Sequence, residues 1–133
     1  MAPAEHRNHA RNYLTKAEEY LASAEANLAA GRHTPAAGDA IHAGISAKDA
    51  IVTALTGTST KGRDHGTAAK ELRQALGRRA EATAAAKALR ELLSAKGEVE
   101  YGVALITAAK AGAIVRRAQG LVGLAVHVVR LGR

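Results

Sequence analysis

Residues 34–55 read TPAAGDAIHAGISAKDAIVTAL, and this stretch decides the fold. Large aliphatic residues recur in it at helical spacing, with alanine and glycine between them: Ile41, Ile45, Val52 and Leu55, with Ala37, Ala40, Gly44 and Ala47. Small residues let a neighbouring helix approach closely, so we expect a helix that packs among other helices. Thr34 is placed to cap its free N–H groups, and Pro35 fits its first turn without losing a hydrogen bond.

The rest of the chain predicts further helices of the same kind. Apolar periodicity marks them at about 11–30, 67–76, 80–95 and 107–131. Gly31, Gly77 and Gly97 are natural stops. Between the helices we expect a polar loop over 56–66 and a connector over 97–106, and residues 1–10 are expected to form a flexible tail. The sequence therefore predicts one all-α domain over 1–133, an up-and-down bundle of four to five helices.

Composition excludes several classes of protein. The 133 residues are 47% hydrophobic but only 2% aromatic, without Phe, Trp or Cys, which favours closely packed helices over a sheet. The absence of cysteine excludes disulfides and cysteine-ligated zinc, and the histidine spacing matches no metal motif, so no metal or cofactor is expected. Arg116, Arg117 and His127 interrupt the most apolar stretch, and the N-terminus lacks the apolar core of a signal peptide. We therefore expect a cytoplasmic protein without a membrane span.

The charge balance bears on partners. The formal net charge is +7 and the sequence pI is about 10.1, a positive field that attracts polyanions such as RNA or DNA. A charge that only keeps the protein soluble is the alternative interpretation. Tyr13, Tyr20 and Tyr101 are the only aromatic residues, so a platform that stacks unpaired bases is not expected.

Two groups of residues are candidate sites. Lys61, Arg63 and His65 stand just before a predicted helix, where free N–H groups favour a bound anion, although an exposed loop with solvated charges would look the same. Asp39 and His42 are three residues apart on one helix face, so that the carboxylate could orient the imidazole as half of a general base. They belong to a polar stripe that a solvated helix face would also explain: Asp39, His42, Ser46, Asp49 and Thr53.

Several segments together resemble a known family. They are residues 10–25 followed by Gly31-Arg32, the alanine-rich second helix with His42, the loop ending Asp64-His65-Gly66, and Val99-Glu100-Tyr101-Gly102 before a long last helix. In this order they resemble HEPN domains, most closely the small actinobacterial type. The resemblance implies a bundle of four or five helices that forms a homodimer. It also implies either a metal-independent ribonuclease with an Arg-x4–6-His motif, in toxin–antitoxin or defence systems, or a motif-less module that binds nucleic acid, nucleotide or a partner protein.

This sequence departs from the family at the catalytic motif. No arginine is followed by histidine after four to six residues, and Arg63 and His65 have only one residue between them. We therefore expect a non-catalytic binding or regulatory module for nucleic acid, a nucleotide or a partner protein. Two alternatives stay open. One is a divergent metal-independent ribonuclease in which Arg63 and His65 do the chemistry, and the other is a structural dimerisation domain.

Overall fold

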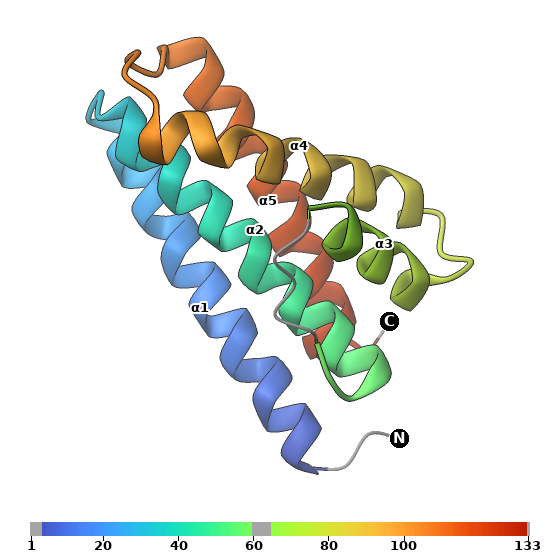
Figure 1. The fold of residues 1–133 in the computed structure, drawn as a ribbon. Coiled ribbons are helices and arrows are strands. Elements are labelled where there is room, and N and C mark those ends of the chain that lie inside the picture. Colours follow the sequence, from blue (N-terminus) through green and yellow to red (C-terminus); the bar gives the residue numbers. More distant parts are fainter. Residues whose placement is uncertain (1–3, 60–64, 133) are drawn as a thin grey trace.

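The computed structural model describes residues 4–59 and 65–132, without the side chain of His65 (Figure 1). This part of the chain is an all-α bundle, as the sequence predicts, and it contains no strand. Its five helices are α1 (Ala4–Ala29), α2 (His33–Thr56), α3 (His65–Leu76), α4 (Ala82–Tyr101) and α5 (Ala108–Arg130).

Helix α2 lies at the centre and contacts each of the other four helices (Figure 1). Its alanines are buried on several sides of the helix, and Ile41 and Ile51 fill the space between them. Gly44 is the point of closest approach, because a Cβ atom there would overlap Cδ1 of Leu92 on α4. The small residues of the segment 34–55 therefore allow neighbouring helices to approach closely, as the sequence predicts.

The start of α2 differs in detail from the prediction. The helix begins at His33, and its first i to i−4 hydrogen bond runs from the Ala36 amide to the Arg32 carbonyl (3.1 Å). Pro35 lies in the first turn, as predicted, where its missing N–H costs nothing. Thr34 also lies inside this turn, one residue past the helix start, and so it is not the cap.

Two boundary predictions were wrong. Helix α1 begins at Ala4, so residues 4–10 are helical rather than a tail, and Ala10 is fully buried where α1 passes the end of α5. Helix α4 does not end at Gly97 as predicted but continues to Tyr101. Gly97 is exposed, while Val99 beyond it is buried against Gly38 of α2, and this packing offsets the cost of about 1 kcal/mol that glycine imposes on a helix.

Helix α5 contains the most apolar stretch of the sequence, which Arg116, Arg117 and His127 interrupt. It lies at the side of the bundle against α1, α2 and α4. Its N-cap is Thr107, whose hydroxyl accepts a hydrogen bond from the Lys110 amide (3.1 Å). Among the described residues it is the one helix long and apolar enough to cross a membrane. Part of its apolar surface belongs to the core, where residues such as Ile114 and Leu121 are buried inside the bundle.

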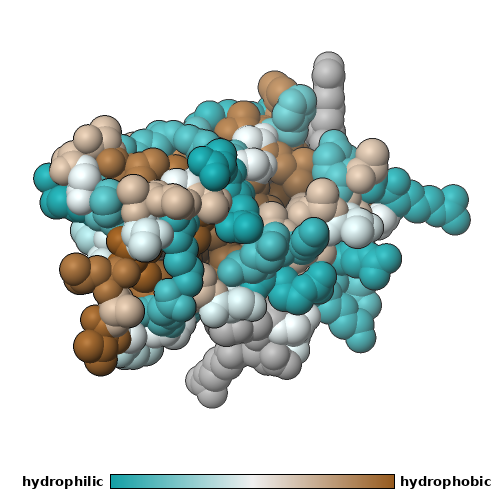
Figure 2. Space-filling model, turned by 90° about the horizontal axis from the view of Figure 1, so that it is seen from above, coloured by the Kyte–Doolittle hydropathy of each residue, from teal (hydrophilic) through white to brown (hydrophobic). Residues whose placement is uncertain are grey.

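The last residue of α4 and the connector that follows it carry exposed apolar side chains. Tyr101 is 82% exposed, Leu105 is 89% exposed, and Val103 is fully exposed. The connector lies at the upper end of the bundle in Figure 1, and the view onto that end shows apolar groups that project from one edge (Figure 2).

The close approach at α2 predicts opposite effects for one substitution at two glycines. Alanine favours a helix over glycine by about 0.5–1 kcal/mol, so Gly97→Ala, which meets nothing within 4 Å, should stabilise the protein by that amount. Gly44→Ala should instead lower the free energy of unfolding by about 1–2 kcal/mol, because the fully buried Leu92 must shift. Urea unfolding followed by circular dichroism measures both, and a stabilised Gly44→Ala variant would contradict the close approach.

Candidate functional site

The predicted anion site of the 56–66 loop lies mostly outside the described residues. This holds for Lys61 and Arg63, while His65 is the first residue of α3 and its side chain is not described. The site is therefore built from the remaining residues. Among these, no three histidine or acidic side chains are grouped so that they could hold a metal ion.

Asp39 and His42 lie on the same side of α2 but have different partners. The Asp39 carboxylate accepts hydrogen bonds from Ser23 (2.6 Å) and Asn27 (3.1 Å), both on α1. The His42 ring stacks on Tyr20, with 5.2 Å between the ring centroids, and its Nε2 lies 3.8 Å from a Glu100 carboxylate oxygen on α4. Among the described residues, no hydrogen bond joins Asp39 to His42, so the carboxylate does not orient the imidazole. Asp39 instead links α2 to α1.

The other half of the polar stripe on α2 is buried. Lys48 is only 3% exposed, and its ammonium lies 2.5 Å from Glu71 on α3 and 3.3 Å from Asp49. It also donates to the hydroxyl of Ser59 (2.9 Å), which in turn donates to Asp49 (2.6 Å). These four residues form what we call the buried polar cluster: Lys48, Asp49, Ser59 and Glu71. The cluster joins α2 to α3 and to Ser59 in the segment that follows α2.

The chemistry of the buried polar cluster is that of a structural clamp. A serine hydroxyl beside a lysine can be a nucleophile and its base, but the base must be a neutral amine. Here the lysine donates to the Asp49 carboxylate and to the Ser59 hydroxyl, and it forms an ion pair with Glu71, which is the pattern of a cation. The cluster therefore holds α3 against the centre of the bundle.

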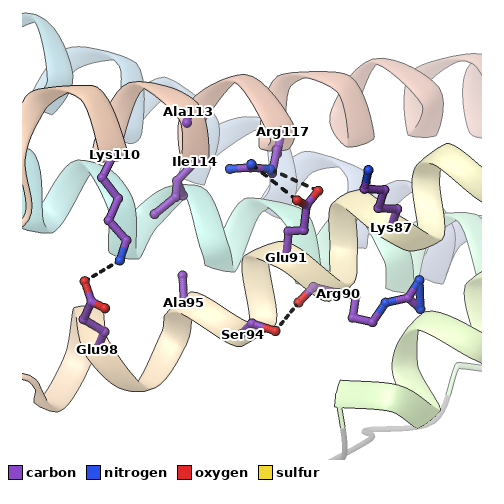
Figure 3. A pocket seen from close by; sticks show the side chains of 10 residues that line it. All are labelled: Lys87, Arg90, Glu91, Ser94, Ala95, Glu98, Lys110, Ala113, Ile114 and Arg117. Carbon is purple, nitrogen blue, oxygen red and sulfur yellow. Dashed lines mark hydrogen bonds and ion pairs between the residues drawn. The ribbon is translucent and has the colours of Figure 1, made fainter.

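A groove about 760 Å³ in volume runs between α4 and α5 and is open to solvent (Figure 3). One stripe of α4 and one of α5 form its walls. Buried Ile114 lies at its floor together with Ala95 and Ala113. Charged side chains surround this floor: Lys87, Arg90, Glu91, Glu98, Lys110 and Arg117. We call it the α4–α5 groove.

The charges of the α4–α5 groove are unbalanced. It holds four cations and two carboxylates, a formal excess of +2. Lys110 forms an ion pair with Glu98, and Arg117 forms one with Glu91, so both acids are already engaged across the two helices. Lys87 and Arg90 are exposed and have no acidic partner among the residues that the structure describes. Two cations are thus available to an anion from solution.

A second, apolar groove of about 310 Å³ continues from Arg117 along the same pair of helices. Its lining is mainly small and aliphatic, with charged residues at its margins: Ala84, Ala85, Ala88, Gly120, Leu121 and Leu124, with Glu81, Arg116 and Arg117. Arg117 belongs to both grooves, so that a charged surface and an apolar surface adjoin on this side of the bundle.

Comparison with known proteins adds no relative: no protein-family model matches the chain, and no curated protein matches it. The α4–α5 groove was also missed by our reading of the sequence. The spacing of Lys87, Glu91, Ser94 and Glu98 marks one face of α4 and was available in the sequence. The partners of that face, Lys110 and Arg117, lie on another helix, so only the packing of α4 against α5 brings the site together.

The burial of Lys48 predicts a large effect of one substitution on stability. Lys48→Met leaves Asp49 and Glu71 without their shared cation, and breaking such a buried pair costs about 3–5 kcal/mol. The matched control is Lys110→Met, which breaks an exposed ion pair and should cost about 0–1 kcal/mol. Chemical denaturation measures both, and equal losses would show that the cluster is not a clamp.

Proposed function

We propose that the protein is a non-catalytic helical module that binds nucleic acid, a polyanion, in the α4–α5 groove. One observation carries the proposal: the groove is open, has a net positive charge, and presents Lys87 and Arg90 without acidic partners in the described residues. The net charge of +7 adds a long-range attraction for the same kind of ligand.

The shape of the groove favours an extended ligand over a small one. Its lining is spread over about three turns of α4, from Lys87 to Glu98, and the groove is a shallow channel between two rods. A phosphate backbone presents charges in a row, which suits cations at successive helical turns. The groove lining contains no aromatic residue, so binding is expected to depend on the backbone and not on stacked bases.

The proposal agrees with the HEPN-like pattern of the sequence, which lacks the Arg-x4–6-His motif. It keeps nucleic acid as the ligand class and assigns no cleavage to the protein. A nucleotide or an acidic partner protein would meet the same cations, and each can be added as an unlabelled competitor of the RNA. A toxin–antitoxin or defence setting, and a cytoplasmic location, remain part of the proposal through the resemblance alone.

Salt-dependent binding tests the proposed function. Fluorescence anisotropy with labelled single-stranded RNA should show an affinity that falls steeply as salt rises. Lys87→Ala/Arg90→Ala should reduce the affinity about tenfold. The slope of log affinity against log salt should become shallower by about 1.4, because each lost phosphate contact changes that slope by about 0.7.

The matched control is Arg11→Ala/Lys16→Ala, which removes the same charge from exposed positions on α1. Among the described residues, α1 does not touch α4, so the control changes net charge without changing the groove. Equal losses in both double variants would mean that only net charge matters, and the groove would then lose its role.

The ribonuclease alternative is tested in the same material. End-labelled RNA is incubated in EDTA with the parent protein and, in a parallel reaction, with an Arg63→Ala/His65→Ala variant. We expect no cleavage by either protein. Cleavage that the double variant abolishes would replace the proposed function by that of a divergent, metal-independent ribonuclease.

We also propose self-association, and the charged residues at the margins of the apolar groove are its specific support. Glu81 and Arg116 are both exposed at its margins, and neither has an ion-pair partner in the described part of the chain. In a two-fold dimer the same patch meets itself, so Glu81 of each copy can face Arg116 of the other across the small-residue floor. This surface fits a homodimer.

A substitution at Gly120 separates self-association from folding. A Cβ atom at Gly120 or at Gly123 would meet nothing within 4 Å, so both positions accept a larger side chain in the monomer. Only Gly120 lines the apolar groove. Light scattering at micromolar concentration should give a dimer for the parent and for Gly123→Gln, and a 13.7 kDa monomer for Gly120→Gln. A monomeric parent would contradict the dimer.

A further inference from the structure

The ion pair between Arg117 and Glu91 has the geometry of a replaceable contact. Nε of Arg117 donates to Oε1 of Glu91 at 3.3 Å, and Nη2 donates to Oε2 at 3.5 Å. Two parallel donors thus meet the two oxygens of one carboxylate, the arrangement by which arginine also grips a phosphate. Both distances are at the long end for hydrogen bonds.

Both members of this pair are open to solvent. The Arg117 side chain is 36% exposed and the Glu91 side chain is 42% exposed, and both lie at the wall of the α4–α5 groove (Figure 3). An exposed ion pair holds its partners only weakly, because water and salt compete with it. An incoming anion can therefore reach the same edge of the guanidinium that Glu91 now occupies.

We propose that Glu91 is an internal competitor of the ligand: its carboxylate occupies the phosphate-binding edge of Arg117, and a bound polyanion displaces it. This inference rests on the proposed function, and it adds a third contact, Arg117, to Lys87 and Arg90. It also gives Glu91 a role in selection. Weak or isolated anions do not displace the carboxylate, whereas a chain of phosphates already held by Lys87 and Arg90 presents the next phosphate at high local concentration.

The other interhelical pair of the groove is less suited to this exchange. Lys110 is a compact ammonium that meets Glu98 through one closely held contact, and it offers no planar edge to a phosphate. Its amide is also the donor in the cap of α5, which places this residue at the helix start. Of the two interhelical pairs, only Arg117 and Glu91 thus have the geometry for exchange with a phosphate.

Removing the competitor should strengthen binding in a defined way. Glu91→Gln keeps the size of the side chain and removes its charge, so Arg117 becomes free for a phosphate. We expect affinity for single-stranded RNA to rise about two- to fivefold, the range that a lost exposed ion pair allows. The slope of log affinity against log salt should steepen by about 0.7, as for one added phosphate contact.

The matched control is Glu18→Gln. Glu18 pairs with Arg130 between α1 and α5, at 2.7 Å, so this variant also frees an arginine and changes the net charge equally, but outside the groove. Its affinity should stay within twofold of the parent. An equal gain in both variants would overturn the inference, because the effect would then be one of net charge alone.

A second background shows whether Glu91 acts through Arg117. In Arg117→Ala the added substitution Glu91→Gln should no longer steepen the salt dependence, since the freed guanidinium is absent. The same steepening with and without Arg117 would overturn the inference. Parent protein that binds RNA, loses affinity in Lys87→Ala/Arg90→Ala, and is unchanged by Glu91→Gln would overturn this inference and leave the proposed function standing. Parent protein that binds no RNA would overturn both.

Discussion

The close approach of four helices to α2 is the constraint on which the rest of the structure depends. Alanine and glycine along α2 leave room for backbones and not for large side chains, and Gly44 has no room even for one more carbon beside Leu92. Each alanine buries little apolar surface, so a core of this kind gains its stability from enclosure on every side. A helix with large residues could be left half exposed, but this one must be surrounded.

Enclosure of α2 explains why a charged cluster sits inside a small bundle. Lys48 lies on the side of α2 that α3 covers, and its two carboxylates and the Ser59 hydroxyl satisfy the ammonium there. Helix α3 is short and also packs on α4, so the clamp on α3 supports the placement of α4. The α4–α5 groove, at the outer side of α4, is thus set by contacts made at the centre of the molecule.

Helix content and the main helices were readable in the sequence, because residues such as Ile41, Val52 and Leu72 repeat at helical spacing and Gly31 and Gly77 end helices with positive φ. The predicted helix boundaries were wrong where packing outweighs local preference. At Gly97, for example, the helix continues because Val99 beyond it is buried. The polar stripe of α2 misled for the same reason, since its periodicity does not show which helix covers it. The groove could not be predicted because its ion pairs join residues 26 and 12 positions apart in the chain.

The exposed connector between α4 and α5 affects the association of molecules in solution separately from conformational stability, two properties that usually change together. Val103 and Leu105 in the connector, and Tyr101 at the end of α4, contribute almost no buried surface, so their apolar character does not stabilise the folded state. It does affect how molecules meet in concentrated solution, because clustered apolar groups on a surface favour association. The colloidal behaviour of this protein can therefore be altered at the connector with little change in its conformational stability, while its charge keeps copies apart at longer range.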